Sequence, residues 1–310
     1  MSGAFGRWYE QAGVRSGPRR IFVDDRAEGT VFFPRRLVPH LAHEAVRDLG
    51  DDVHEALTLR HLYQFLHSTT HVETRVVNQG AERIANGRSG VEVSVAERLD
   101  AFKVYADEGY HALYSLDLAA QVAAATGVAV PDWDYGTFVD RLARTAADAL
   151  PDAPVLAQLL QVVVFETLVT AVLNELPADP SVVGTVRDLI RDHARDEGRH
   201  HRFFAAFFHR LWQGLGAGER RAVAGCLPGL ILDCLRADVA PVRASLALAG
   251  LGRDAIEAVV ADCYSAAGDP ARIRQITRAT VGMCRSAGVF AVPGAADGFA
   301  ARGLDPEAAE

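Results

Sequence analysis

From Leu37 onward, apolar residues recur every three to four positions, which is the period of helices that bury one face. The alternation typical of strands is almost absent, apart from a short strand-like stretch at 21–23. The sequence therefore predicts an all-α protein. The pattern and its breaks predict helices over 39–49, 58–84, 94–125, 135–150, 155–175 and 181–215, and two or three more within 219–248 and 254–286.

Capping and turn residues set the expected ends of these helices. Thr58 is expected to cap the long helix that stops at Asn86. Ser94 and Glu97 have the spacing of a capping box, and Gly127 is expected to end the helix that they start. The C-terminal helices are expected to be interrupted by two prolines, Pro228 and Pro241.

These elements divide the chain into three expected parts. Residues 1–36 are rich in Gly, Arg and Asp and predict an irregular arm that packs on the body. Residues 37–290 are expected to form one helical domain with a core bundle at about 55–215. Residues 291–310 predict a flexible tail.

Composition excludes several classes of protein. A net charge of -8 and a pI of about 5.8 argue against a nucleic-acid binder. The most apolar stretch, 155–173, contains Gln158, Gln161 and Glu166, so a buried helix is favoured over a membrane span. The N-terminus lacks the apolar region of a signal peptide, and the four cysteines form no Cys-x-x-Cys pair. A cytoplasmic protein is therefore expected.

The pentapeptide Asp-Glu-Gly-x-His occurs twice, at 107–111 and 196–200. In each copy the Glu and the His are three residues apart, so both project from one face of a helix. A single Glu in an apolar stretch precedes each copy, by 35 residues in the first case and by 31 in the second. Two such Glu residues with two Glu-x-x-His pairs form the ligand set of di-iron sites in four-helix bundles. The candidate ligands are Glu73, Glu108, His111, Glu166, Glu197 and His200.

Burial and charge favour a metal site over a coincidence of acids. The four glutamates lie on apolar helix faces, where a carboxylate is costly unless it is paired or metal-bound. Two ferrous ions would balance four carboxylates, and carboxylate with imidazole suits iron or manganese. Zinc is disfavoured because structural zinc sites close at four ligands and usually use sulfur. The open alternative is that one or more of these glutamates faces water.

Neighbouring residues extend the expected site. His193 lies on the face of Glu197 and His200 and is a candidate third imidazole, or else a histidine bonded to a nearby Asp. We expect a crossed pairing, in which Asp107 bonds His200 and Asp196 bonds His111; two solvated acids are the alternative. The repeated mid-helix glycines indicate either close helix approach or a local bulge, at Gly109 and Gly198.

This pattern resembles the p-aminobenzoate N-oxygenase (AurF-like) family, which are non-haem di-iron oxygenases of the ferritin-like superfamily. The resemblance covers about 55–215, and its most specific part is His193, four residues before the last Glu. It implies a ferritin-like four-helix bundle core with additional N- and C-terminal helices. It also implies one iron held by Glu73, Glu108 and His111, and another by Glu166, His193, Glu197 and His200, with Glu108 and Glu197 bridging.

The resemblance implies an activity as well: O2-dependent oxidation of an amine nitrogen, through a peroxo-di-iron intermediate, to hydroxylamine, nitroso or nitro products. Thr170 is a candidate partner for iron-bound oxygen, or a core threonine. An arginine is expected to hold an acidic substrate, with Arg272, Arg274, Arg278 and Arg285 as candidates. Because no flavin or nicotinamide motif is present, electrons are expected from a reductase, a ferredoxin or peroxide. A homodimer is expected. The alternatives are a C-hydroxylase or desaturase, or an iron-storage protein.

Overall fold

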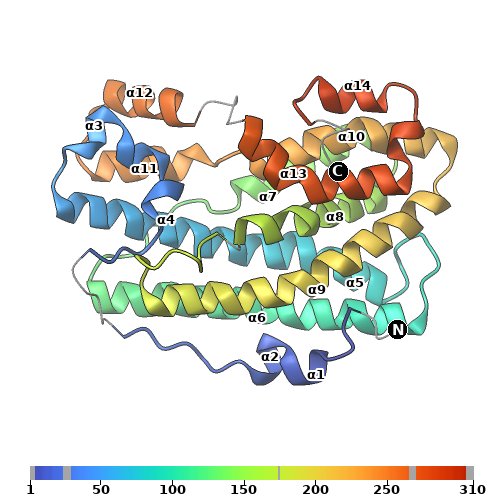
Figure 1. Cartoon of the computed structure of the whole chain (residues 1–310), viewed down its shortest axis with the longest axis horizontal. Helices are drawn as coiled ribbons and strands as arrows, with labels where there is room; N and C mark the ends of the chain where they lie inside the picture. The colour runs from blue at the N-terminus through green and yellow to red at the C-terminus, as the bar shows by residue number, and fades with distance from the viewer. Residues whose placement is uncertain (1–3, 24–28, 174, 265–269, 305–310) are drawn as a thin grey trace.

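Long, roughly parallel and antiparallel helices form the body of the protein (Figure 1). The structure is a computed structural model that describes residues 4–23, 29–173, 175–264 and 270–304, without the side chains of 170–172. Over these residues the chain is all-α, as the periodicity predicts, and one parallel bridge between Val31 and Val182 is its only strand-like pairing. Among the described helices, none has a stretch long and apolar enough to cross a bilayer.

Four helical segments pack into the central bundle. The first is a continuous rod in which a π-helical turn joins two α-helices, and the others are single long helices. Their bounds are α4 (Asp51–Val72), η3 (Glu73–Val77), α5 (Asn78–Ala85), α6 (Val95–Thr126), α8 (Pro154–Leu173) and α9 (Gly184–Gly214).

Further helices cover this bundle. α7, α10 and α13 pack against α8, and α11 packs against α4. The N-terminal pieces lie along α6 and α9 (Figure 1). The remaining bounds are α1 (Trp8–Gln11), α2 (Gly13–Ser16), η1 (Arg35–Leu37), η2 (Pro39–Ala42), α3 (Glu44–Arg47), α7 (Thr137–Ala149), α10 (Ala217–Leu235), α11 (Val239–Leu248), α12 (Arg253–Cys263), α13 (Pro270–Ala287), η4 (Val289–Ala291) and α14 (Ala295–Ala300).

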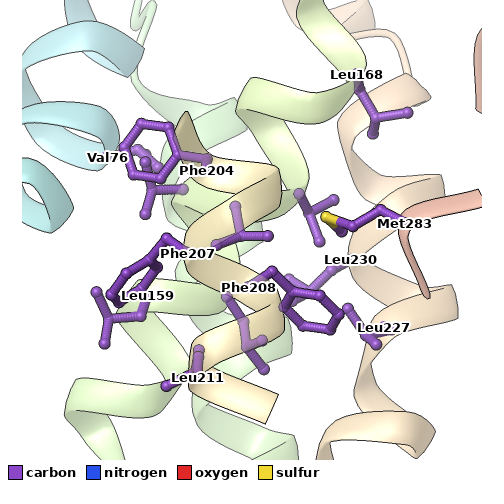
Figure 2. Packing of buried hydrophobic residues seen from close by; sticks show 14 of the residues in the cluster. Val76, Leu159, Leu168, Phe204, Phe207, Phe208, Leu211, Leu227, Leu230 and Met283 are labelled. Carbon is purple, nitrogen blue, oxygen red and sulfur yellow. The ribbon is translucent and has the colours of Figure 1, made fainter. Parts of the chain in front are cut away.

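Two apolar clusters fill the bundle on either side of a polar middle. One contains Val76, Leu159 and Phe204 and extends to α10 and α13 (Figure 2). The other contains Leu62 in α4 and Ile190 in α9. The doubled pentapeptides and the two preceding glutamates lie between these clusters along the helices, so both ends of the polar middle are closed by packed side chains.

The cap predictions have mixed outcomes. Ser94 and Glu97 form the capping box, and Gly127 ends α6 with a φ of 72°. Thr58 is not a cap, because α4 already begins at Asp51 and the Thr58 hydroxyl donates to the Glu55 carbonyl within the helix, at 2.9 Å. Extra turns thus precede the predicted start.

The stretch at 21–23 pairs in no strand. Two further predictions are wrong. Pro228 lies inside α10, and the break falls at 236–238 instead. The tail is ordered to residue 304: α14 forms there, and Phe299 and Leu304 are fully buried in the core. Residues 305–310 lie outside the described part of the chain.

The two pentapeptide glycines do not mark a close helix contact or a bulge. α6 and α9 are regular α-helices at Gly109 and Gly198, and a Cβ on either would meet nothing within 4 Å. The close contact is at Gly80, where a Cβ would lie 2.5 Å from the Val162 side chain. The bulge is the π turn η3.

Candidate metal centre

The bundle brings the predicted glutamates and histidines together in its buried middle. They come from η3, α6, α8 and α9, and none of these residues is more than 1% exposed. Their ligand atoms form two groups, each within a 4.8 Å span, and two glutamates belong to both. One group is Glu73, Glu108, His111, His193 and Glu197, and the other is Glu108, Glu166, Glu197 and His200.

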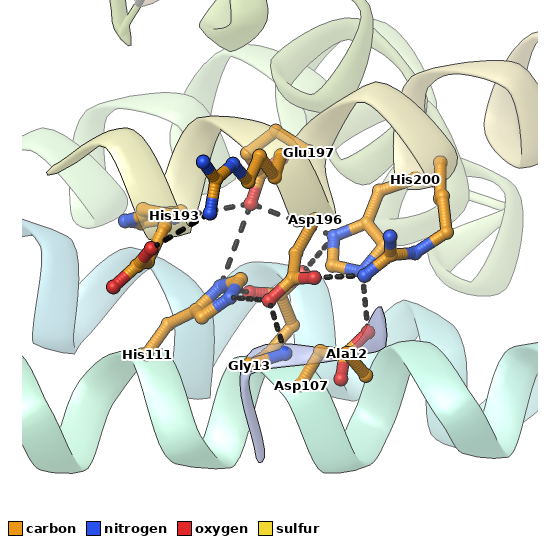
Figure 3. A network of polar contacts seen from close by, with 12 residues as sticks. Ala12, Gly13, Asp107, His111, His193, Asp196, Glu197 and His200 are labelled. Atoms are coloured by element: carbon orange, nitrogen blue, oxygen red, sulfur yellow. Dashed lines mark hydrogen bonds and ion pairs between the residues drawn. The ribbon is translucent and has the colours of Figure 1, made fainter. Parts of the chain in front are cut away.

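The two pentapeptide histidines are oriented alike. The Nδ1 atoms of His111 and His200 lie 2.8 and 2.7 Å from the two oxygens of Glu108. Their Nε2 atoms lie 3.2 Å from Asp196 and 3.1 Å from Asp107, respectively (Figure 3). Both contacts of the expected crossed pairing are therefore present. Because an Asp accepts a hydrogen bond from each Nε2–H, the Nδ1 lone pair stays available for a cation.

His193 joins the group opposite to the one that the resemblance implied. Its Nε2 lies 3.0 Å from Glu197 and 3.4 Å from Glu73, and its ring centroid is 4.0 Å from that of His111. Glu166 and His200 belong to the other group. The structure thus groups His193 with Glu73, whereas the resemblance implied a place beside Glu166. Spacing along α9 could not reveal this, because the packing of the neighbouring helices determines which glutamates each histidine contacts.

The electrostatics divide the four glutamates into two pairs. Burial, followed by repulsion from neighbouring carboxylates, raises the pKa of Glu73 and of Glu166 well above the usual value. For Glu108, burial acts in the same direction, but His200 and His111 outweigh it and lower its pKa to about 2. Burial is likewise outweighed at Glu197, where His200 and His193 hold the pKa well below the usual value.

Several buried ligand atoms have no hydrogen-bond partner among the described residues. They are both oxygens of Glu166 and one oxygen each of Glu73 and Glu197. A buried carboxylate without a partner is costly, whereas a divalent cation supplies both charge and coordination. The donor set of carboxylates and imidazoles therefore fits two divalent ions of the iron or manganese type.

The π turn supplies Glu73. It follows directly from α4 at Val72, and the wider turn rotates the residues after it relative to a continuous α-helix. Glu73, Val76 and Val77 are all buried within it. Nothing in the apolar periodicity of this segment distinguishes a π turn from an α turn, so the sequence reasoning missed it.

A largely apolar cavity of about 410 Å³ reaches the metal centre. It touches Glu73 and His193 at its inner end. Its polar groups include Gln64 and Ser68, but aromatic and aliphatic side chains dominate. The aromatic side chains in its wall are Phe33, Phe65, Phe138 and Phe165.

One of the four candidate arginines lines this cavity. Arg272 does so while it pairs with Glu175 at 3.1 Å. The others are not among the described lining residues; Arg274 and Arg278 are exposed and Arg285 is half-buried. Thr170 belongs to α8, but its side chain is outside the described part of the chain.

Comparison with known proteins identifies the family. The model of the p-aminobenzoate N-oxygenase AurF family matches residues 23–288. The chain belongs to this family. It is therefore a member of an oxygenase family whose enzymes use two irons, and the buried Glu and His cluster is able to hold such ions. A search of curated proteins finds no match for this AurF family member.

Tyr114 is a further residue at the centre that the sequence reasoning did not single out. It lies one turn after His111, and its ring is 5.4 Å from that of His111 and 5.9 Å from that of His193. Its hydroxyl is buried without a hydrogen-bond partner among the described residues. Burial and the nearby glutamates raise its pKa well above the usual value, so the phenol stays protonated. The sequence could have indicated this residue, because a position three residues after His111 lies on the same helix face.

Proposed function

We propose that the protein is an O2-dependent di-iron oxygenase that oxidises the nitrogen of an arylamine. The observation that carries this proposal is the pair of buried ligand groups that share Glu108 and Glu197, one of which reaches an aromatic-lined cavity through Glu73 and His193. When bound, iron supplies the oxygen-activation chemistry that side chains lack. Membership of the p-aminobenzoate N-oxygenase family supports nitrogen as the atom oxidised.

The chain itself contributes ligands, orientation and exclusion of water. Glu73 and Glu166 would each help to hold one ion, and Glu108 and Glu197, which belong to both groups, would help to hold both. Asp107 and Asp196 would hold the two histidines with Nδ1 free. The apolar clusters on both sides of the centre would keep water from the reacting atoms.

The cavity fits the shape and polarity of an aromatic amine. Its volume of about 410 Å³ lies within the usual range for small-molecule sites. Phe65, Phe138 and Phe165 would pack against an aromatic ring. With the ring held there, the amine nitrogen would point to the inner end at Glu73 and His193.

The first oxidation balances as arylamine plus O2, two electrons and two protons, giving arylhydroxylamine and water. An external reductase or ferredoxin would supply the electrons. Alternatively, hydrogen peroxide would replace O2, the two electrons and the two protons together. Repetition of such steps would lead to nitroso and nitro products.

The decisive experiment measures metal and product together. The purified protein is loaded with Fe²⁺ without oxygen, the bound iron is counted, and ¹⁸O2 is added with a panel of arylamines, a chemical reductant and mass-spectrometric detection. We expect about two irons per chain and one ¹⁸O atom on nitrogen in the hydroxylamine. A matched pair of variants completes the test: Glu166→Ala should lose iron and product, whereas Glu257→Ala, at an exposed surface pair with Arg243, should lose neither.

Other outcomes separate the remaining functions. Label on ring carbon would identify a hydroxylase. Growth of an iron mineral core, with no oxidised amine, would identify a storage protein. No iron uptake by the wild-type chain would overturn the proposal altogether.

A further inference from the structure

The N-terminal arm lies along α6 and α9 at the level of the metal centre (Figures 1 and 3). Here the arm means residues 4–22. Phe5 and Trp8 are almost fully buried, and Ala12 is completely buried. The ring of Phe5 stacks on that of His200 at a centroid distance of 6.1 Å. The arm thus forms part of the wall around the centre.

Two arm donors reach the two aspartates that orient the histidines. The Trp8 indole Nε1–H donates to Oδ2 of Asp107 at 2.8 Å, and this oxygen also faces Nε2 of His200. The Gly13 backbone N–H donates to Oδ2 of Asp196 at 3.2 Å. That oxygen in turn faces Nε2 of His111 (Figure 3). Each aspartate therefore joins one arm donor to one histidine.

Salt bridges hold the far end of the arm to the same two helices. Arg19 forms a forked ion pair with Asp117 of α6, at 2.7 and 2.8 Å. Arg20 pairs with Asp192 of α9 at 2.6 Å. The arm is consequently fixed on both sides of the segment that carries Trp8 and Gly13.

We propose that the arm is a working part of the metal centre, in which Trp8 and Gly13 position Asp107 and Asp196 and, through them, His200 and His111. The inference rests on the proposed metal site. The family match begins at residue 23, so neither Trp8 nor Gly13 lies within it. The arm is therefore a feature of this chain that the family match does not assign.

The physical reason is that a buried carboxylate follows its hydrogen bonds. In Asp107, Oδ1 has no partner among the described residues, so Trp8 and His200 provide its hydrogen bonds. Without the indole, Asp107 is free to rotate and His200 loses its fixed orientation. Loss of a group that bonds a metal ligand directly typically lowers metal affinity by roughly 10- to 100-fold, and Trp8 acts one contact further out, so a loss of up to about 10-fold is expected.

Gly13 acts through backbone geometry. A Cβ at this position would lie 2.9 Å from Oδ2 of Asp196, closer than real Cβ contacts allow. Any side chain at residue 13 must therefore displace the arm or the Asp196 carboxylate, whose Oδ1 accepts a hydrogen bond from Arg199, and this displacement disturbs the contact of Oδ2 with His111. The two donors thus address different ligand groups, since His200 and His111 belong to separate groups.

The test is an anaerobic Fe²⁺ titration of the full chain, with the two binding steps resolved by competition with a chelator and by ligand-field circular dichroism. We expect Trp8→Phe to weaken the step that involves His200, and Gly13→Ala to weaken the other, each by up to about 10-fold. The double variant should weaken both. Tyr9→Phe is the control: Tyr9 is 62% exposed in the same helical turn, and both steps should keep their wild-type affinities.

A variant that weakens only one Fe²⁺-binding step indicates that its residue positions one ligand group. A variant that weakens both steps equally indicates a general loss of structure. Equal weakening of both steps by each single variant, or wild-type affinities in both, would overturn the inference. If Trp8→Phe does not fold, Gly13→Ala alone must still weaken only its own step. Two tight steps in the wild type with unaffected variants would leave the proposed function standing, whereas no binding by the wild type would overturn both.

Discussion

His193 presents its Nε2 atom to Glu73 and Glu197 from one turn before the second pentapeptide. The helical face of this residue could be read from the sequence, but its partners could not. A position on α9 fixes the direction of the side chain only relative to α9 itself. Whether it meets Glu73 or Glu166 depends on how the neighbouring helices are rotated.

A substitution at His193 tests this placement. His193→Ala should fold, because the apolar clusters do not include His193, but the Glu73 group should lose one imidazole. We expect weaker binding of one of two Fe²⁺ ions and loss of most N-oxygenation, measured by iron titration and product yield. His209→Ala is the matched control on α9, since His209 contacts Ser286 away from the centre. Wild-type iron affinity and turnover in His193→Ala would remove it from the ligand set.

His40 makes a separate prediction about acid stability. Burial lowers the pKa of His40 to about 4, and its Nε2 has no partner among the described residues. Between pH 4 and 6.5 this histidine is therefore protonated in the unfolded chain but neutral in the folded chain. The free energy of unfolding consequently falls as the pH falls. The expected loss is about 1.4 kcal/mol per pH unit, or about 3 kcal/mol over this window.

Denaturant unfolding of the wild type and of His40→Gln across pH 4 to 7 measures this contribution. The difference in the free energy of unfolding between the two proteins should change with pH by the amount that corresponds to about one proton in this window. Below pH 4 the difference should become independent of pH. His43→Gln serves as the comparison. Parallel curves for wild type and His40→Gln would show that His40 titrates normally in the folded protein.

At the scale of elements, capping residues predicted both ends of α6, but the sequence did not predict the π turn within a helix or the helix that continues through a proline. The capping box at Ser94 and the glycine at 127 act through neighbours in sequence, so they were readable. The π turn at Glu73 gains its stability from contacts of η3 with α6 and α8, which are distant in the sequence. Pro228 shows the converse: a local breaker is tolerated inside α10, where it is buried.

Two glycine substitutions distinguish an effect of helix packing from an effect of local helix propensity. Gly80→Ala should destabilise the protein by about 1–3 kcal/mol, because its Cβ would lie 2.5 Å from Val162 and force α5 away from α8. Gly225→Ala, exposed in α10 with nothing within 4 Å of its Cβ, should stabilise by up to about 1 kcal/mol. Chemical denaturation of both variants measures the contrast. A stabilised Gly80→Ala would mean that α5 and α8 are not in close contact there.

On the scale of the whole molecule, α6 carries a row of exposed apolar side chains. Their spacing of three to eight residues keeps them on one side of the helix. At about half exposure, six such side chains present on the order of 600 Å², near the roughly 800 Å² per partner of a stable complex. The row consists of Val95, Leu99, Phe102, Tyr105, Leu113 and Leu116.

We expect the homodimer implied by the family resemblance to form through this row. Leu113→Glu should shift the protein to a monomer, because a charge would be buried between two copies of α6. Leu248→Glu, a similarly exposed leucine in α11, should not. Light scattering coupled to size exclusion measures both masses. A monomeric wild type, or a dimeric Leu113→Glu, would contradict this expectation.

Periodicity predicted the all-α class and most helices, and the spacing of the repeated pentapeptides and their preceding glutamates predicted the candidate ligands. These features depend on which residues share a helix face, and that is a local property of 3.6-residue turns. Packing decided the rest: the π turn under Glu73, the side taken by His193, the cavity, the ordered chain to residue 304, and the arm that brings Trp8 to Asp107 across 99 positions. Such contacts join segments far apart in the chain, so their geometry is set only when the helices have found their rotations and depths against one another.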